Sequence, residues 1–347
     1  MPASPASKPR LLTGDRPTGG LHLGHLVGSL RQRVAMQDDY ECFNIVADLH
    51  TLTTRPKAEQ IRGLPSSVRD MVVDLLSVGI DPERTVIYLQ SGVPAVYDLA
   101  ILLQMLVPSE RLHSLDSVKE MAEAAGQASA MSLGLLAYPV LQAADILMAK
   151  AQIIPVGGDN VAHVEIAREL AVRFNELYGS LFELPEARVS RTPHLPGIDP
   201  GASAAVKMSK SRKNGIWLRD DSAAVHEKLA AIAGPRLRAF VDAFIEDEQE
   251  RQALLESLDA KSASEDAVRA EVESSIEAAL TPIRSRRSEL EGERGRVEEI
   301  LVDGTIRARE VAYTTLGRVR ELMGLEGLWQ GLVAATEARA EARKKPY

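Results

Sequence analysis

The sequence predicts an α/β protein, in which a parallel sheet is followed by an all-helical region. Short apolar runs at 42–47, 85–90 and 152–156 alternate with amphipathic segments of helical period. This alternation is typical of a parallel sheet with helices on both faces. Beyond about residue 221 the strand pattern stops, and apolar residues recur every three or four positions, as in amphipathic helices.

The first strand is expected at 11–12, ahead of a glycine-rich loop and a helix. Proline inside the next long helical pattern, at Pro139, predicts a kink there. The proline- and glycine-rich stretch 184–206 is expected to be a connector without regular structure. Further helices are expected at 65–78, 95–106, 131–148, from 160 to 174, across 268–301 and at 325–343.

Composition limits the class of protein. The 347 residues suggest about two domains, and 45% apolar and 26% charged residues are usual for a globular protein. The first nine residues are small and polar, so we expect a disordered tail rather than a secretory signal. Cys42 is the single cysteine, which excludes an internal disulfide and fits a reducing, cytoplasmic location. The net charge of −8 argues against non-specific coating of nucleic acid, and the apolar stretch 133–156 is too interrupted to span a membrane.

The glycine-rich stretch 13–25 predicts a phosphate site. It joins the first strand to a helix, so its free backbone N–H groups and the helix N-terminus favour an anion. It matches neither G-x-G-x-x-G nor G-x-x-x-x-G-K-[ST]. His22 and His25 flank Gly24, where a ligand can approach the backbone, and their ring N–H groups can donate to phosphate oxygens. A metal site at these histidines is disfavoured, because no further ligands cluster nearby in the sequence.

Two other groups of polar residues suggest a ligand site. Lys207 and Lys210 lie at the end of the connector, where they could close over a triphosphate; ordinary solvated lysines are the alternative. Tyr138, Gln142 and Asp145 share one helical face within an apolar segment. A carboxylate in such surroundings predicts a pocket that selects a matching donor, although capping or pairing with a nearby lysine is a structural alternative.

Taken together, two short motifs resemble the signatures of the class I aminoacyl-tRNA synthetases. His22-Leu23-Gly24-His25 is similar to the H-I-G-H signature, and 207–211 reads K-M-S-K-S, about 180 residues later. The resemblance covers about residues 10 to 345. It implies a Rossmann-like catalytic domain at 10–220 for ATP and the amino acid, and a helical anticodon-binding domain at 221–347, after a tail at 1–9.

The remaining landmarks resemble the tryptophan and tyrosine subclass, and most are similar to its tryptophanyl branch. They are 78–82, 90–94, 143–147, 155–159 with the positions that follow, and 282–284. The tyrosyl branch stays open, because Tyr138, Gln142 and Asp145 also fit its pattern. Indole N–H only donates, so Asp145 alone satisfies it, whereas a phenol needs a second partner. Tyrosyl enzymes supply that partner from a tyrosine where this chain has Leu12, so tryptophan is favoured.

The resemblance implies the site residues, the substrates and the partners. His22, His25, Lys207 and Lys210 are the expected catalytic residues. ATP is expected to contact Arg16, Pro17, Thr18, Gly24, His25, Gly157, Gly158, Asp159, Lys207, Met208, Ser209, Lys210 and Ser211. L-tryptophan is expected to contact Asp145, Tyr138, Gln142, His50, Ile154 and Val156. Mg²⁺ is expected to arrive with ATP, with no metal held by the protein alone, and tRNA(Trp) and a second copy in a homodimer are the expected partners, with no membrane.

The activity implied is tryptophan–tRNA ligation in two steps, through an adenylate and then transfer to tRNA. Arginines of the helical region could contact RNA phosphates, or pair with nearby glutamates; they are Arg284, Arg286, Arg287, Arg307 and Arg309. A synthetase-like paralogue with a binding or regulatory role is a further hypothesis, as is another H-x-G-H nucleotidyltransferase. Arg16 and Asn160 depart from the residues common in the family, which leaves their roles open.

Overall fold

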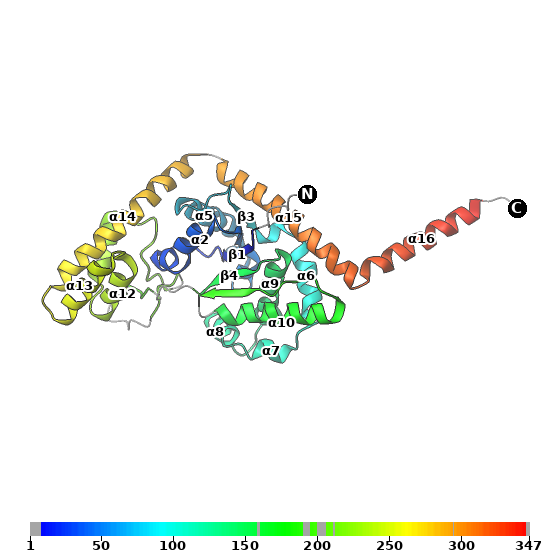
Figure 1. The fold of residues 1–347 in the computed structure, drawn as a ribbon, viewed down its shortest axis with the longest axis horizontal. Coiled ribbons are helices and arrows are strands. Elements are labelled where there is room, and N and C mark those ends of the chain that lie inside the picture. The colour runs from blue at the N-terminus through cyan, green and yellow to red at the C-terminus, as the bar shows by residue number, and fades with distance from the viewer. Residues whose placement is uncertain are drawn as a thin grey trace, which may run out of the picture.

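The computed structural model describes residues 8–157, 160–189, 195–199, 206–210, 212–293 and 295–344, and side chains as far as residue 340. Its centre is a parallel sheet of five strands in the order β3-β2-β1-β4-β5, and helices surround this sheet (Figure 1). The strands are β1 (Arg10–Asp15), β2 (Glu41–Val46), β3 (Thr85–Leu89), β4 (Ile153–Val156) and β5 (Glu186–Val189). The α/β class and the Rossmann-like parallel sheet are therefore confirmed.

The helices of the first half connect successive strands. They are α1 (Leu23–His25), which runs through η1 (Leu26–Leu30) into α2 (Arg31–Met36), then α3 (Asp48–Leu52), α4 (Ala58–Arg62), α5 (Leu64–Ser77), η2 (Gln90–Gly92), α6 (Ala95–Gln104), α7 (Ser109–His113), α8 (Asp116–Ala124), α9 (Leu133–Met148) and α10 (Val161–Tyr178). The helix α9 continues through Pro139 without a break. Polar sequence patterns explain why α4, α7 and α8 were not expected.

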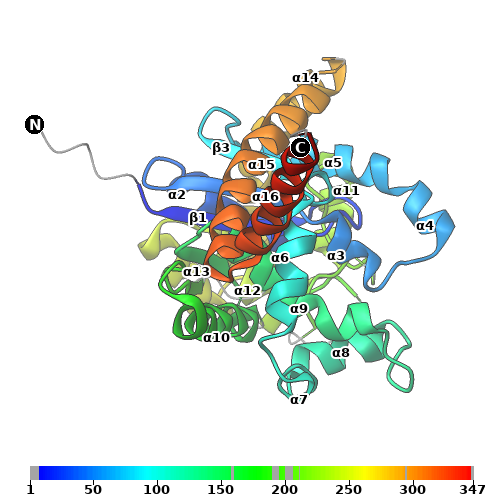
Figure 2. The same cartoon turned by 90° about the vertical axis from the view of Figure 1, so that its right-hand side faces the viewer.

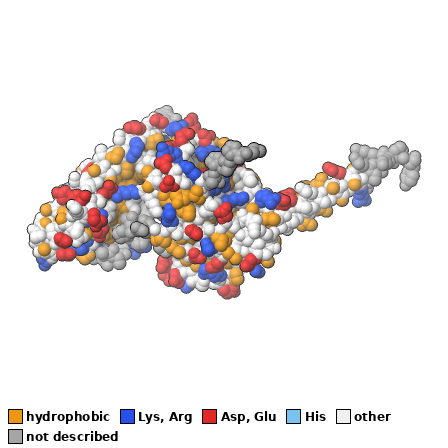
Figure 3. All heavy atoms as spheres, in the orientation of Figure 1, with side chains coloured by type: hydrophobic (Ala, Val, Ile, Leu, Met, Phe, Trp, Pro, Cys, Tyr) orange, Lys and Arg blue, Asp and Glu red, His pale blue; other side chains and the backbone are white. Residues whose placement is uncertain are grey.

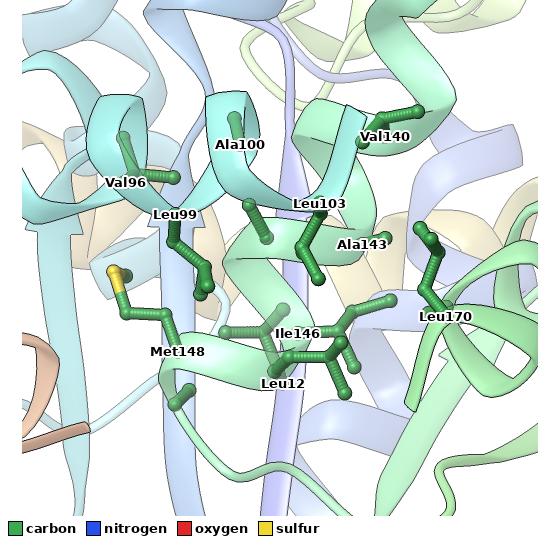
Figure 4. Packing of buried hydrophobic residues seen from close by; sticks show 14 of the residues in the cluster. Leu12, Val96, Leu99, Ala100, Leu103, Val140, Ala143, Ile146, Met148 and Leu170 are labelled. Carbon is green, nitrogen blue, oxygen red and sulfur yellow. The ribbon is translucent and has the colours of Figure 1, made fainter. Parts of the chain in front are cut away.

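Two hydrophobic cores lie on opposite faces of the sheet, because side chains alternate along each strand. Phe43 and Ile45 of β2 face a core shared with α6, α9 and α10, and Leu12 packs there with Ile146 (Figure 4). Val46 faces the second core, which holds the glycine-rich loop, α5 and the helices that follow the sheet. The expectation of helices on both faces is confirmed.

The helices after the sheet form two parts. On one side of the molecule lie α11 (Ser222–Ala230), α12 (Pro235–Phe244) and α13 (Glu248–Asp259), together with most of α14 (Glu265–Gly292) (Figure 1). The long helix α15 (Arg296–Leu322) then returns to the sheet and packs against β3 and α6 (Figure 2). At Gly304 an added Cβ would lie 1.9 Å from the Ile87 carbonyl oxygen, so only glycine permits this close approach.

The last helix, α16 (Leu325–Lys344), extends away from the body, close to the expected range of 325–343 (Figure 1). The described part of the chain contains no helix that combines the length and apolar character of a membrane span. The stretch 184–206 differs from expectation, since it contains β5. That strand has an exposed, charged face, with Glu186 and Arg188, and therefore lacks the apolar run of a buried strand.

Candidate active site

A cavity of about 930 Å³ opens at the carboxyl ends of β1, β2 and β4. This is where parallel sheets place ligand sites, because the loops that follow the strands gather there. One half is lined by the glycine-rich loop and by Met208, Ser209 and Lys210. The other half is lined by polar side chains of α3, α9 and α10 against apolar walls from the strands. The two halves are continuous, so two ligands can meet inside the cavity.

Both histidines of the glycine-rich loop are neutral. Burial, and then the nearby Lys210 ammonium, lower the pKa of His22 to about 4. Burial and the His22 ring lower the pKa of His25 well below its usual value. The Nδ1 atom of His25 accepts the His22 backbone N–H at 3.2 Å, which leaves the proton of the neutral ring on Nε2. The pair can therefore donate hydrogen bonds to a ligand without adding charge.

Space is tight at the glycine between these histidines. An added Cβ at Gly24 would lie 3.0 Å from the His22 ring and 3.5 Å from Met208 Cβ. Beneath the loop, Asp15 pairs with Arg33 at 2.5 Å. Burial alone would raise the pKa of Asp15, but the Arg33 guanidinium lowers it to about 2. The charges of Asp15 and Arg33 therefore compensate each other below this half of the cavity, and the pair anchors the end of β1.

Positive charge in this half comes from Arg16, Arg55 and Lys210. Burial and repulsion by Arg55 lower the pKa of Arg16, whose side-chain contacts are with Thr54 Oγ1 at 3.5 Å and Met121 Sδ at 3.9 Å. Arg55 and Lys210 donate to backbone oxygens of the loop, at Thr18 and Gly19. Among the described residues, no carboxylate forms an ion pair with these three cations. Uncompensated cations that converge on a cavity favour a polyphosphate.

The lysine motif is divided between the cavity and the surface. Lys210 lines the cavity, whereas the Lys207 side chain is exposed and does not. Asn214 holds the motif in place: its Oδ1 accepts the Ser209 N–H at 2.7 Å, and its Nδ2 donates to the Lys207 oxygen at 3.3 Å. The predicted role of Lys207 is not supported by this arrangement and stays a prediction.

Most of the expected ATP residues reach the cavity. Arg16, Thr18, His25, Gly157, Met208, Ser209 and Lys210 line it, together with His22. Pro17 and Gly24 lie in the same loop without lining it. Gly158, Asp159 and Ser211 fall outside the described residues. Asn160, whose role was left open, also lines the cavity.

Asp145 is the centre of the second half. The residue is 2% exposed, and its Oδ2 accepts from Gln90 Nε2 at 2.7 Å and lies 3.1 Å from His50 Nε2. Its Oδ1 is buried, and no described residue donates to it. Burial raises the pKa of Asp145, and the hydrogen bonds from His50 and Gln90 oppose that rise. The free Oδ1 is an acceptor that a ligand with a single donor would satisfy.

The other expected amino-acid residues surround Asp145. Tyr138, Gln142, His50, Ile154 and Val156 all line the cavity, and so does Leu12. The Tyr138 hydroxyl lies 3.0 Å from His163 Nε2, which in turn lies 2.7 Å from Ser117 Oγ. The Tyr138 hydroxyl therefore already has a hydrogen-bond partner within the protein. The walls contributed by Leu12 and Ile154 are apolar, which suits the face of an aromatic ring.

Two residues were missed from the sequence: Arg55, which lines the cavity, and Gln90, which does not line it but donates to Asp145. Arg55 follows the short helix α3, which starts where β2 ends, and its position at that strand end is the signal that could have found it. Gln90 is 1% exposed and follows β3. Its Oε1 accepts the His50 N–H at 3.3 Å, so its amide nitrogen must face Asp145. Arg55 appears in the sequence only as an ordinary polar position, whereas Gln90 begins the stretch 90–94 that resembles the family but was given no role there.

The fold and the cavity define a Rossmann-like enzyme that brings a polyphosphate and a second ligand together. The family model described as "tRNA synthetases class I (W and Y)" matches residues 4–279, and the chain therefore belongs to that family. It is an aminoacyl-tRNA synthetase, and the family predicted from the two motifs is confirmed.

Relatives that match over nearly their whole length support this assignment. The tryptophan–tRNA ligase of Treponema pallidum is 45% identical over 331 residues, which cover 91% of this chain and 97% of that protein. The tryptophan–tRNA ligase of Borreliella burgdorferi is 40% identical over 346 residues, or 95% and 97% of the two chains. The structure of tryptophanyl-tRNA synthetase from Campylobacter jejuni, complexed with ADP and tryptophan, is 30% identical with a TM-score of 0.76, and covers 91% of this chain and 99% of that one.

Proposed function

We propose that this chain, a tryptophan–tRNA ligase, carries out both steps of its reaction in the cavity at the ends of β1, β2 and β4. A carboxylate oxygen of L-tryptophan attacks the α-phosphorus of ATP, and the bond to the β-phosphate oxygen breaks to release pyrophosphate. A ribose hydroxyl at the end of tRNA(Trp) then attacks the aminoacyl carbonyl and releases AMP. Neither step needs a protein nucleophile, so positioning and charge stabilisation supply the catalysis.

The phosphate half would act through its cations. Negative charge grows on the departing pyrophosphate during the first step, and the half-buried side chains of Lys210 and Arg16 line that region of the cavity. Because they are partly desolvated before ATP binds, their interaction with the growing charge is stronger than in water. The neutral rings of His22 and His25 would donate hydrogen bonds to the phosphates. Because these rings carry no charge, they would not slow the release of pyrophosphate by ionic attraction.

Tryptophan specificity would rest on one observation, the unsatisfied Oδ1 of Asp145. The indole N–H would donate to it, while the apolar walls with Leu12 contact the ring. A tyrosine hydroxyl both donates and accepts, and its acceptor capacity would remain unsatisfied against Leu12. The ground for preferring tryptophan is thus a difference in hydrogen bonding rather than in size.

Mg²⁺ would enter with ATP. The carboxylates that line the described part of the cavity are Asp15 and Asp145, and both are already engaged by cations or donors. In the described part of the chain, no cluster of three or more potential ligands could hold a metal ion. Mg²⁺ in nucleotide sites is held largely by phosphates and waters. The phosphates of ATP would therefore supply its ligands here.

The helical region would bind tRNA(Trp) and read its anticodon. Arg284 pairs with Glu277 at 2.7 Å, and Arg287 is buried, so neither is available to RNA in this arrangement. Arg286 and Arg307 are exposed and could contact phosphates. The visible face mixes basic and acidic side chains (Figure 3), which suits recognition of a defined RNA rather than general attraction.

The homodimer and the cytoplasmic location belong to the same proposal. Tyr97 and Ile101 of α6 and Met105 directly after it recur every four residues, and they are 41%, 56% and 71% exposed. An exposed apolar stripe of this kind supports contact with another protein surface, and a second copy would cover it. Free tRNA and ATP are both present in the cytoplasm.

ATP–pyrophosphate exchange measured with each amino acid tests this proposal, followed by charging of tRNA. Exchange that depends on tryptophan, with transfer to tRNA(Trp), is the expected result. Exchange with tyrosine and none with tryptophan would contradict the assignment of the pocket. Formation of the adenylate without charging of any tRNA would favour the regulatory paralogue.

A further inference from the structure

A buried carboxylate and a buried guanidinium connect the helical region to the glycine-rich loop. Asp74 of α5 is 2% exposed, and Arg287 of α14 is 8% exposed. Arg287 Nη1 contacts Asp74 Oδ1, and Asp74 Oδ2 accepts the backbone N–H of Leu21 at 2.8 Å. Leu21 directly precedes His22, so this contact reaches the loop that lines the phosphate half of the cavity.

Each side of the loop is held by a different element. The strand-like segment after the lysine motif pairs with the loop, since Leu23 N–H donates to the Ile216 oxygen at 2.9 Å and Leu218 N–H donates to the Leu21 oxygen at 3.0 Å. Lys210 donates to the Gly19 oxygen at 3.0 Å. The Leu21 N–H has no partner among these backbone groups, and Asp74 is its acceptor. Without Asp74 this buried donor would be unsatisfied.

Arg287 is the cation that pairs with Asp74. Burial raises the pKa of Asp74, while the Leu21 N–H and then the Arg287 guanidinium lower it. Arg287 also reaches Asp70 at 3.5 Å and Glu291 at 3.0 Å, and both of these carboxylates are partly exposed. A charged pair of this kind is weak evidence for stability, because well-packed apolar residues often replace such pairs without loss. Its position therefore calls for another explanation.

We propose that Asp74 is a positioning residue for adenylate formation, which fixes the Leu21 N–H and so the His22–His25 segment, and that Arg287 of the helical region holds Asp74 in place. The hydrophobic packing agrees, because Leu21, Leu23 and α14 belong to one core. The inference rests on the proposed function of the loop as the ATP site. It adds that the helical region contributes directly to the geometry of that site.

Two double variants separate positioning from stability. Asp74→Leu with Arg287→Met removes both charges and also the acceptor for the Leu21 N–H. Asp74→Asn with Arg287→Met removes the same charges but keeps an oxygen that can accept this N–H. Both pairs avoid an isolated buried charge, so both should fold. Asp70→Asn is the matched control, since it removes a carboxylate that contacts Arg287 but not the loop.

Tryptophan-dependent ATP–pyrophosphate exchange and thermal unfolding are measured on all of them. We expect kcat of the Leu–Met pair to fall by about 10- to 100-fold, with the KM for tryptophan unchanged, because loss of positioning costs rate. We expect the Asn–Met pair to lose less kcat than the Leu–Met pair, because the acceptor for the Leu21 N–H is retained. We expect Asp70→Asn to stay within about threefold of wild type, because Asp70 does not contact the loop. Equal kcat in the two double variants, or a loss of kcat that follows the unfolding temperature, would overturn the proposal.

Hydrogen exchange of the loop gives a second measurement that needs neither double variant. In Arg287→Gln we expect the peptide that contains Leu21 to exchange at least about tenfold faster, while sheet peptides keep their protection, because only local opening changes. Equal protection in Arg287→Gln and wild type would refute the role of Arg287. Lys210→Ala, assayed in parallel, tests the ATP site itself. If this variant keeps full ATP–pyrophosphate exchange activity, the proposed function of the phosphate half fails, while the hydrogen-exchange result for Leu21 still stands.

Discussion

Removing the indole N–H from the substrate should lower kcat/KM only in a protein that retains Asp145. A tryptophan analogue with sulfur in place of the indole N–H keeps the shape of the ring and lacks the donor. Asp145 is 2% exposed, and its Oδ1 is buried without a described partner. A hydrogen bond to a charged group contributes about 1.5–3 kcal/mol. At about 1.4 kcal/mol per factor of ten, the wild type should prefer tryptophan over the analogue by about 10- to 150-fold in kcat/KM.

Asp145→Ala should lose this preference, because the acceptor is gone. Its kcat/KM for tryptophan should also fall, chiefly through a higher KM, since Gln90 and His50 lose their partner as well. ATP–pyrophosphate exchange with both substrates and both proteins forms a complete cycle. The KM for ATP is the internal control and should change little. A preference for tryptophan that persists undiminished in Asp145→Ala would refute the assignment of Oδ1 to the indole.

Three further predictions concern the phosphate half. Lys210→Ala should lower kcat for activation by about 100-fold and change the KM for ATP far less, because Lys210 would act on the leaving group. Lys207→Ala, at an exposed position, should have the smaller effect. Equal losses in kcat and ATP affinity for Lys210→Ala would argue against this role. Arg55→Gln should raise the KM for ATP about tenfold through loss of a charged contact, which steady-state kinetics would detect; an unchanged KM would remove Arg55 from the site. The pKa of His22 falls from 6.5 to about 4 on folding, so the unfolded chain binds more protons between these pH values. The contribution of His22 to the free energy of unfolding should therefore drop by about 3 kcal/mol as the pH falls through this range. Urea titrations of His22→Asn should show a shallower pH dependence than wild type; an equal slope would contradict the burial of a neutral ring.

The regular parts of the fold were predictable from local patterns. The strands β2, β3 and β4 are apolar runs, and α5, α6 and α10 carry an apolar face, so periodicity located them. The edge strand β5 was not predictable in this way, because pairing with β4 rather than burial of its own side chains makes it a strand. The return of α15 to β3 depends on contacts between distant residues, such as the Leu89 N–H with Thr305 Oγ1 at 3.1 Å.

The same distinction, between local patterns and contacts of distant residues, decides which site residues could be predicted. The residues in motifs, such as His25 and Lys210, reach the cavity as expected, because the resemblance and the strand–loop–helix pattern place them there. Arg55 lies in no motif, and Gln90 lies in the stretch 90–94 that resembles the family without a predicted role. The contact of Gln90 with Asp145 appears only once the fold brings β3 and α9 together. The lysine motif shows the limit of such reasoning, since two lysines three residues apart lie in different surroundings once Asn214 fixes the turn.

The cavity lies between two separate hydrophobic cores, and this explains how one site can treat its two substrates differently. Leu12, Ile146 and Ile154 wall the amino-acid half and belong to the core with α9 and α10. Leu21 and Met208 belong to the other core, shared with α5 and α14. Close packing within a core couples its members, while the backbone of the sheet separates one core from the other. Under the proposed function, the fit to indole can therefore be rigid, while the phosphate half would take its geometry from the helical region through Arg287 and Asp74.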